Sequence, residues 1–553
     1  MPTTPDSPLS TPMRPLAVPA PRPRGDWDAW GSEPARLPAA AKAIVATLLP
    51  GKAHPVPHRA RPVLPPSLLR DDDLAALTAV VGTEHATRDD AVRMLHLGGK
   101  STTDLLRRRL DEPQAAPDAV IAPTGHDQVA AVLRVCAARG IAVVPFGGGT
   151  SVVGGVDPVR GAHAAVIALD LSRTAALLAL DEVSLLATFG AGTTGPQAEE
   201  LLGARGYTLG HFPQSFLYAS LGGYAATRSS GQASRGYGRF DELVHALRVA
   251  APAGDLDLGR SPASAAGPDL RELFLGSEGA FGVLTEVTVR IRPVPAATAY
   301  RAWSFPDFAA GASAFREATQ RGIRPTVLRL SDETETRVNA AMGGHLTRLR
   351  GCLAVATFEG ATAAEAEATR DALDAVFRAH GATSRGEDPA RSWERGRFAS
   401  PALRDTLMDS GVLAETLETA TTWSNLPALK SAVTAALAES LTASGSKPIV
   451  LCHISHVYPA GASLYFTVVA ALTDDPQTQW STAKDAASRA IGDAGGTITH
   501  HHAVGRDHRR YLEAEIGPLG VEVLRAVKGV LDPEGIMNPG ALVAPAVETP
   551  GHA

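Results

Sequence analysis

The residues of this sequence that best suit proton transfer are three consecutive histidines: His500, His501 and His502. Imidazole titrates near neutral pH, so it can both accept and donate a proton. The preceding residues, Gly496–Thr499, have the pattern of a strand, and on an extended chain the first and third histidines would share one face. A solvated loop, a proton-transfer site and a metal site remain alternatives, although no acidic residue flanks the triplet.

Tyr465 is a second candidate for proton transfer. It lies in the segment Gly461–Val469, where the alternation of side chains predicts a strand, and in that pattern a core tyrosine is an equal alternative. Arg404 is a candidate of another kind. One interpretation is an ion pair with Asp405 or with another nearby residue. The other is a buried guanidinium that holds a phosphate or carboxylate of a substrate.

An uncharged glycine-rich stretch, PFGGGTSVVGG, runs from Pro145 to Gly155. Glycine adopts positive φ without a steric penalty, so successive backbone N–H groups can turn toward one anion. Helical spacing over His126–Arg139, with Gly140 at the C-cap, and the apolar run Ile141–Pro145 predict a helix and a strand that deliver this loop. The flanks favour a phosphate cradle over a flexible loop. The loop has neither GxGxxG spacing nor the lysine of a P-loop.

Two further stretches offer backbone amides and small side chains. Residues 214–230 are rich in serine, glycine and alanine, and residues 278–284 form a glycine-punctuated loop that leads into an alternating strand ending at Ile291. Small residues let a flat ligand approach the backbone, but they equally let two elements pack together. Between the two stretches, Asp255–Gly259 has the composition of a turn.

The PFGGGTSVVGG loop resembles the diphosphate-binding loop of flavoproteins related to vanillyl-alcohol oxidase, and the two further stretches resemble segments that wrap the flavin in that family. The resemblance implies an α+β fold with a two-subdomain FAD-binding domain of p-cresol methylhydroxylase or vanillyl-alcohol oxidase type, an α/β cap domain, and helical N- and C-terminal segments. It also implies noncovalent FAD, because the loop lacks the His or Cys to which covalent members link the flavin. The implied FAD contacts are Pro145, Phe146, Gly147, Gly148, Gly149, Thr150, Ser151, Gln214, Ser215, Ser220, Gly223, Thr227, Arg228, Ser229, Ser230, Glu278, Gly279, Ala280, Phe281, Gly282, Val283 and Leu284.

The composition excludes several classes of protein. The chain has 553 residues, of which 44% are hydrophobic and 20% charged, with a formal net charge of -6. It is long enough for two or three domains and has no basic excess that would suit nucleic acid. Its three scattered cysteines argue for a reducing compartment and against a thiolate metal site, and we expect no bound metal. No apolar run of about 18 residues predicts a membrane span, so a cytoplasmic location is the default interpretation.

Composition and periodicity divide the chain into five segments. Helices are expected over 68–81 and 89–110, and in the second part of the chain strands alternate with helices around an antiparallel sheet. The five expected segments are a disordered Pro-rich tail (1–25), an N-terminal helical segment (26–113), an FAD-binding domain (114–296), a cap or substrate domain (297–510) and a C-terminal helical segment that completes the FAD-binding domain (511–545).

Four motifs narrow the resemblance to the alkyldihydroxyacetonephosphate synthase family, in conserved order along the chain: WDAWG at 27–31, the Arg404 segment, GASLYF at 461–466 and HHHAVG at 500–505. The related D-lactate and D-2-hydroxyglutarate dehydrogenases have metal-binding GHxGDGNxH and EHG motifs in these places. Here Tyr465 stands at the second histidine of the first motif, and His500 stands at the glutamate of the second. The dehydrogenase metal set is therefore broken.

This resemblance implies FAD-dependent ether-lipid synthesis with no net redox change, in which a fatty alcohol replaces the acyl group of acyl-dihydroxyacetone phosphate through an adduct on flavin N5. By position, Tyr465 would be the acid/base and the histidine triplet would assist proton transfer and departure of the carboxylate. Arg404 would hold the substrate phosphate, and Arg329 would order the site. We further expect a homodimer, and a lipid substrate would favour peripheral membrane contact, although no basic amphipathic helix stands out.

The sequence departs from the eukaryotic members of that family at His453 and His456, where they carry Arg and Gln, and the segment between Arg337 and Cys352 is short. These departures bear on the substrate more than on the fold. An FAD-linked oxidase or dehydrogenase of a 2-hydroxy acid or alcohol is the alternative function.

Overall fold

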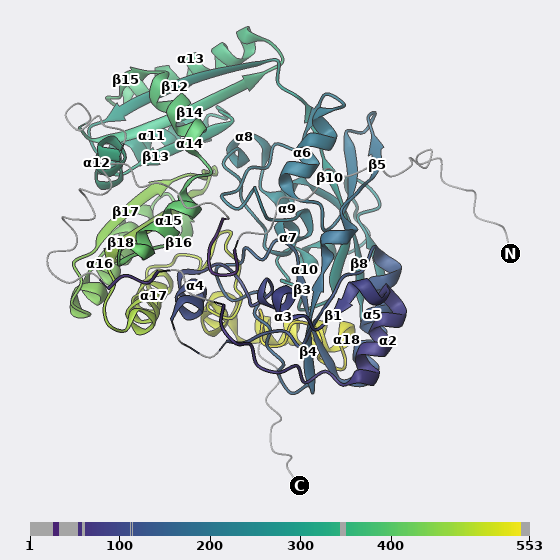
Figure 1. Ribbon diagram of the computed structural model, residues 1–553. Coiled ribbons are helices and arrows are strands. Elements are labelled where there is room, and N and C mark those ends of the chain that lie inside the picture. The colour runs from purple at the N-terminus through teal and green to yellow at the C-terminus, as the bar shows by residue number, and fades with distance from the viewer. Residues whose placement is uncertain are drawn as a thin grey trace.

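The computed structural model describes residues 26–31, 54–57, 61–110, 112, 114–342 and 350–543. The Pro-rich tail expected over 1–25 lies outside these residues. The described chain has two halves that lie side by side in Figure 1, one around a four-stranded and a five-stranded sheet and one around a seven-stranded sheet. Helices and strands contribute to both halves, and the α+β class predicted from the sequence is confirmed.

The first half contains a four-stranded sheet of order β1-β2-β4-β3. Its strands are β1 (Ala86–Thr87), β2 (Ala119–Ile121), β3 (Ile141–Phe146) and β4 (Ala165–Asp170). The last three are parallel and almost entirely buried. Between β2 and β3 runs α5 (His126–Arg139), which ends at Gly140 with a left-handed φ of 61°. The predicted helix, its C-cap and the strand that leads into the glycine loop are confirmed.

The same half contains a five-stranded antiparallel sheet of order β5-β6-β10-β8-β9. Its strands are β5 (Leu177–Asp181), β6 (Leu186–Gly190), β8 (Val244–Ala251), β9 (Gly254–Leu258) and β10 (Val283–Arg290). The turn predicted over Asp255–Gly259 is wrong, because most of these residues form β9 and pair with β8. Leu256 and Leu258 pack against the core of this half, which outweighs the turn preference of Asp255 and Asp257.

The second half is built on a seven-stranded antiparallel sheet of order β15-β12-β14-β13-β17-β18-β16. Its strands are β12 (Ala297–Phe305), β13 (Val327–Ser331), β14 (Cys352–Gly360), β15 (Thr383–Gly386), β16 (Val412–Thr422), β17 (Ile449–Ile454) and β18 (Gly461–Ala471). Leu464 and Phe466 of β18 join a core that also includes residues of α16 (Leu426–Ala443) and α17 (Pro476–Asp493). The predicted alternation of helices with an antiparallel sheet is confirmed, whereas the exact domain boundaries stay predictions.

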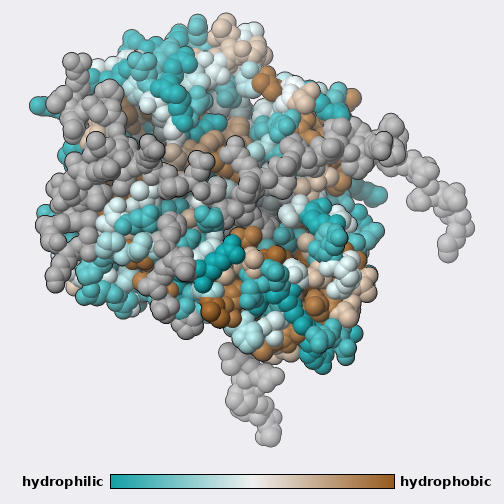
Figure 2. All heavy atoms as spheres, in the orientation of Figure 1, coloured by the Kyte–Doolittle hydropathy of each residue, from teal (hydrophilic) through white to brown (hydrophobic). Residues whose placement is uncertain are grey.

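The remaining elements connect or cover these sheets. They are α2 (Asp71–Val81), α3 (Asp90–Met94), α4 (Thr102–Arg109), α6 (Gly195–Gly203), β7 (Tyr207–Thr208), α7 (Leu221–Ala226), α8 (Ser234–Tyr237), α9 (Phe240–Leu243), α10 (Arg271–Phe274), β11 (Arg292–Pro293), α11 (Phe308–Gln320), α12 (Glu333–Met342), α13 (Ala363–Ala379), α14 (Asp388–Gly396), α15 (Ser400–Asp409) and α18 (Leu512–Leu531). α18 returns to the first half, where Leu512 and Val521 pack into its core. Among the described helices, none is long and apolar enough to cross a membrane. On the face shown in Figure 2, apolar side chains are scattered among hydrophilic ones.

The helical structure predicted over 89–110 forms as two helices, α3 and α4, with a break between them. At the break Gly99 lies so close to the glycine loop that a Cβ would overlap the carbonyl oxygen of Ser151. Ser101 then starts α4 with a capping box. The break brings Lys100 against the loop, where its backbone N–H donates to the Ser151 carbonyl at 2.7 Å.

Candidate active site

The three stretches predicted to bind a cofactor meet in the structure. A Cβ at Gly148 would overlap the carbonyl oxygen of Tyr218, so the glycine loop and the 214–230 stretch touch through their backbones. A Cβ at Gly279 would lie 2.8 Å from Pro145 Cγ, which places the third stretch against the start of the same loop. At these contacts glycine is required by close approach of the chain, and the three stretches form one continuous wall.

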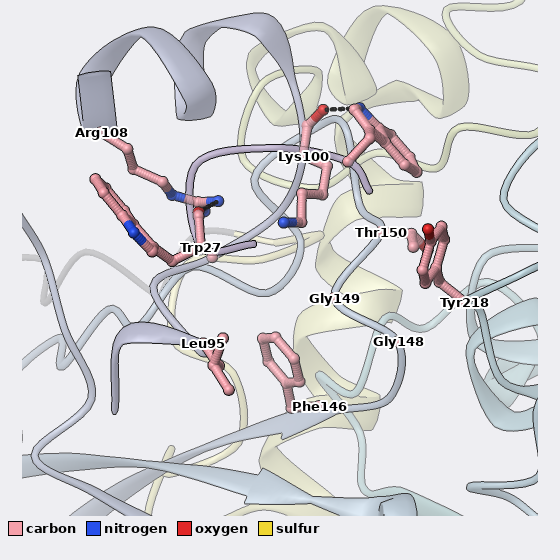
Figure 3. A pocket seen from close by; sticks show the side chains of 11 residues that line it. Trp27, Leu95, Lys100, Arg108, Phe146, Gly148, Gly149, Thr150 and Tyr218 are labelled. Atoms are coloured by element: carbon pink, nitrogen blue, oxygen red, sulfur yellow. Dashed lines mark hydrogen bonds between the residues drawn. The ribbon is translucent and has the colours of Figure 1, made fainter. Parts of the chain in front are cut away.

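A pocket opens along this wall. Its lining residues are Trp27, Trp30, Leu95, Gly98, Lys100, Arg108, Phe146, Gly148, Gly149, Thr150 and Tyr218. Figure 3 shows Lys100 and Arg108 across the pocket from the glycine loop, with Phe146 at its base. Burial and the neighbouring Arg108 lower the pKa of Lys100 to about 7. The Arg108 guanidinium, a partly protonated Lys100 and a turn of backbone amides give the pocket the chemistry of a diphosphate site. Both side chains also donate to backbone carbonyls at the pocket rim, those of Asp26, Trp27 and Gly99.

Several polar atoms near this wall are buried without a hydrogen-bond partner in the part of the chain that the structure describes. They include Gln214 Oε1, Ser230 Oγ and Ser277 Oγ. An unpaired buried polar atom is costly, so these atoms are suited to a polar ligand. Gln214 and Ser230 were both predicted as FAD contacts, and the residues present fit that cofactor.

Two predicted FAD contacts use their side chains to hold the loops. Arg228 has a φ of 50°, and its guanidinium donates to Asp241 at 3.2 Å and to Glu272 at 2.5 Å. The Glu278 carboxylate accepts from the backbone N–H of Gly505 at 2.8 Å, and burial raises its pKa to about 7. Their direct contact with FAD stays a prediction, as does that of the other residues on the three stretches.

The cap sheet places the predicted chemical residues on one face. Tyr465 of β18 lies opposite Glu418 of β16 and opposite His453 of β17, and residues paired in this way in an antiparallel sheet point to the same side. The next strand, β13, supplies Arg329, whose Nη2 donates to His453 Nδ1 at 2.9 Å and to Glu335 at 2.7 Å. The ring of His453 stacks on that of Tyr465 at 4.9 Å. The opposite face of β18 carries the core residues, so successive side chains along this strand point alternately to the candidate site and to the core.

The histidine triplet folds around one buried carboxylate. The backbone N–H groups of His500, His501 and His502 donate to the two oxygens of Glu418 at 2.6–2.9 Å. The strand predicted over Gly496–Thr499, with alternate histidines on one face, is wrong, because this capping bends the chain into turns. Tyr465 then lies beside two rings of the triplet, with centroids 6.0 Å from His501 and 5.8 Å from His502.

The triplet also joins the two halves of the molecule. A few residues further on, a Cβ at Gly505 would overlap the carbonyl oxygen of Val153 in the glycine loop. The Arg506 N–H donates to that carbonyl at 2.9 Å, while the Gly505 N–H donates to Glu278. The proton-transfer residues of the cap are therefore anchored directly on the cofactor wall.

The site holds neutral bases beside protonated tyrosine. Burial lowers the pKa values of His500, His501 and His502, that of His500 to about 4, although Glu418 acts in the opposite direction. Burial raises the pKa of Tyr465 to about 12. Burial opposes ionisation of Glu418, but attraction to the triplet imidazoles when they are protonated, together with the backbone N–H groups, outweighs it and holds its pKa well below the usual value. At neutral pH the histidines can accept a proton and Tyr465 can donate one.

Arg404 lies on α15 and is already engaged by the protein. Its guanidinium donates to Glu415 at 3.2 Å and to the carbonyl of Lys100, and it lies over the Trp30 ring at 5.3 Å. It pairs with Glu415 rather than with its neighbour Asp405. The Nε atom is buried without a partner among the described residues, and the charge acts on His502. The guanidinium thus connects the pocket with the triplet, and its phosphate contact stays a prediction.

Sequence reasoning missed several members of this site. Glu418, His453 and Tyr458 received no role, and WDAWG was read only as a motif, although Trp27 and Trp30 line the pocket with Lys100 and Arg108. Tyr458 Oη lies 2.7 Å from His500 Nε2. The signal for Glu418 was its place near the middle of a strand, since a carboxylate that is buried there needs a partner.

A diphosphate cradle behind a parallel sheet, closed by a cap that carries bases and a tyrosine, defines an FAD-dependent enzyme of the vanillyl-alcohol oxidase type. Residues 117–257 match the family model "FAD binding domain", and residues 294–542 match "FAD linked oxidases, C-terminal domain". A solved structure of p-cresol methylhydroxylase shares this fold, with a TM-score of 0.66 at 14% identity, over 87% of this chain and 99% of that one.

The match to one branch is closer. Alkyldihydroxyacetonephosphate synthase of Trypanosoma brucei brucei is 33% identical over 505 residues, which are 87% of this chain and 82% of that protein. A solved alkyldihydroxyacetonephosphate synthase structure superposes with a TM-score of 0.80 at 26% identity and covers 93% of this chain and 98% of that one. The chain belongs to the alkyldihydroxyacetonephosphate synthase family.

Proposed function

We propose that this chain exchanges the acyl group of acyl-dihydroxyacetone phosphate for a fatty alcohol, with no net redox change. The observation that carries the proposal is the set of neutral histidines around Glu418 beside protonated Tyr465, on a cap anchored to the cofactor wall. Membership of the family, with relatives named for this reaction, supports the same assignment. The alternative, an FAD-linked oxidoreductase of hydroxy acids or alcohols, is not favoured.

The reaction breaks the bond between the substrate carbon and the ester oxygen, and it forms a bond between that carbon and the alcohol oxygen. The fatty acid leaves as a carboxylate, and the alcohol loses its proton. Bound FAD would supply the chemistry at this carbon that lets the oxygen of the alcohol replace the oxygen of the ester. The triplet histidines accept protons released at the substrate carbon and at the alcohol, Tyr465 returns one, and Arg404 holds the phosphate.

FAD is held without a covalent bond in this proposal. The N–H groups of the glycine loop, with Lys100 and Arg108 opposite, would hold its diphosphate, and Gln214 and Ser230 would bond its polar edges. An anion in the pocket would favour the charged form of Lys100, whose pKa of about 7 reflects burial next to Arg108.

Gly148→Ala is expected to lower FAD affinity at least about ten-fold, or about 1.4 kcal/mol. The added Cβ would overlap the Tyr218 carbonyl oxygen and separate two parts of the cofactor wall. Flavin absorbance per protein and a fluorescence titration measure the change. Gly125→Ala is the matched control, because its Cβ would enter open space and its φ of -179° suits any residue. Equal FAD content in the two variants would argue against the wall.

The proposed reaction is tested with purified FAD-loaded protein, palmitoyl-dihydroxyacetone phosphate and ¹⁸O-labelled hexadecanol. We expect one labelled oxygen in the ether product and one equivalent of palmitate, without an electron acceptor. No ether product at full FAD occupancy would refute the proposal. Anaerobic bleaching of the flavin by a small hydroxy acid, reversed only by an electron acceptor, would establish the alternative.

The proposal includes a homodimer, peripheral membrane contact and a cytoplasmic location. Contact with a surface is supported by the exposed apolar side chains of α18, which include Leu519, Val523 and Val530. Sedimentation velocity tests the homodimer and flotation with phospholipid vesicles tests the contact. Sedimentation as a monomer would refute the homodimer. Protein that does not float with the vesicles would refute the membrane contact.

A further inference from the structure

The proposed function leaves His456 without a role. This histidine follows β17, is only 5% exposed, and has an Nδ1 atom that is buried without a hydrogen-bond partner among the described residues. Its ring stacks on His500 with centroids 5.1 Å apart and meets the edge of His501 at 5.5 Å. A buried ring nitrogen without a partner is costly unless a further species binds it.

The three rings present their nitrogens to one another. One ligand atom from each of His456, His500 and His501 lies within 4.8 Å of the other two. The Nδ1 atoms of His500 and His501 are 2.9 Å apart. In a tetrahedral zinc site, metal–nitrogen bonds of about 2.0–2.1 Å place neighbouring ligand nitrogens about 3.3 Å apart. The His500–His501 pair is near that spacing but is hydrogen-bonded, so binding of an ion would replace this hydrogen bond and draw in the nitrogen of His456.

The surroundings favour the neutral, metal-binding form of the rings. Burial lowers the pKa values of His456, His500 and His501, so their lone pairs are available at neutral pH. The Tyr458 hydroxyl occupies His500 Nε2 at 2.7 Å and leaves Nδ1 to face the cluster, as outer partners of metal-binding histidines do. The Glu418 carboxylate lies 3.6 Å from His501 Nδ1 and offsets added positive charge. The positive charge of Arg239 also acts on His456 and opposes the binding of a cation there.

We propose that His456, His500 and His501 bind a divalent first-row transition-metal ion, such as Zn²⁺, through three imidazole nitrogens. Three neutral nitrogen ligands suit Zn²⁺, Co²⁺ and Ni²⁺ far better than Mg²⁺ or Ca²⁺. The dehydrogenase metal motifs remain broken in this chain, and the site uses His456 with two histidines of the triplet instead. This proposal departs from the sequence-based expectation of no bound metal.

A consequence follows that rests on the proposed function. The ion would occupy ring nitrogens that the synthase reaction uses to accept protons, so Zn²⁺ is expected to inhibit ether formation. Binding of the ion itself does not depend on that reaction. The two ideas can therefore fail separately.

The binding test is a Co²⁺ titration of untagged, FAD-loaded protein, followed at wavelengths longer than those of flavin absorption. We expect one Co²⁺ per chain with the intense visible bands of four- or five-coordinate cobalt. His456→Gln should weaken binding at least about ten-fold. His380→Gln is the control, because it removes a histidine paired with Glu317 elsewhere in the cap. Weak bands of six-coordinate cobalt, or equal affinity in both variants, would overturn the site.

The X-ray absorption spectrum of the unmodified protein with one equivalent of Zn²⁺ gives an answer that needs no variant. Three imidazoles at about 2.0 Å are expected. A shell of water and carboxylate oxygens alone would overturn the proposal even if His456→Gln fails to fold. Zn²⁺ binding without inhibition of ether formation would keep the site and contradict only the roles assigned to His500 and His501.

Discussion

Tyr465→Phe is expected to lower the rate of ether formation by about 10²- to 10⁴-fold, the range typical of a lost general acid. The substitution removes only a hydroxyl, and the ring can keep its 4.9 Å stacking on His453. Since burial raises the pKa of Tyr465 to about 12, the hydroxyl is a proton donor through the neutral pH range. Steady-state rates with palmitoyl-dihydroxyacetone phosphate and hexadecanol measure the effect, and flavin absorbance should show unchanged FAD content.

Tyr300→Phe is the matched control for this change. Its hydroxyl donates to Glu394 at 2.7 Å in another part of the cap, so the variant should keep normal turnover. Tyr458→Phe should lower turnover less than Tyr465→Phe does and more than Tyr300→Phe does. It removes the hydroxyl that bonds to His500 Nε2 but leaves Tyr465, the proton donor, in place. Full turnover by Tyr465→Phe would show that the proton comes from elsewhere and that the cap residues are misassigned.

The parts of the fold that could be predicted are those in which local pattern and burial agree. α5 and β3 have an apolar period, a glycine C-cap and almost complete burial, and the expected elements formed. The break between α3 and α4 could not be predicted from the local pattern, because its cause is a contact of Gly99 with a loop some 50 residues further along the chain. β9 is a similar case. Its own residues favour a turn, and it forms a strand because it pairs with β8.

The candidate site divides in a similar way. Tyr465, Arg329 and the triplet could be selected by residue type and resemblance, and the structure brings them together. Their arrangement depends on Glu418, which lies more than 80 residues before His500. The two become neighbours because the chain after α17 runs beside β16, where the Thr497 N–H donates to the Ala420 carbonyl at 3.0 Å. Chain folding around a distant buried charge leaves little trace in the local sequence, so the triplet was misread as a strand.

Glu418→Gln is expected to lower turnover at least about 100-fold, because small displacements of catalytic groups cost that much. The carboxylate oxygens accept three backbone N–H bonds from the triplet, and an amide offers one acceptor oxygen and brings donors against the other N–H groups. Hydrogen bonds to a buried charge contribute about 1.5–3 kcal/mol each, so the melting temperature should also fall by several degrees. Steady-state kinetics and calorimetry measure both effects.

The pH dependence of stability separates this role from general damage to the cap. The folded pKa of Glu418 is well below its unfolded value, so its contribution is present above about pH 4.5 and is lost as the pH falls through the folded pKa. Glu418→Gln should therefore unfold with a shallower acid dependence than the parent. Glu317→Gln, at an exposed position that pairs with Arg321 and His380, should change the stability and its acid dependence much less, because water screens these pairs. If both variants behave alike, the triplet is held by its packing, and the carboxylate of Glu418 is not what orders the bases.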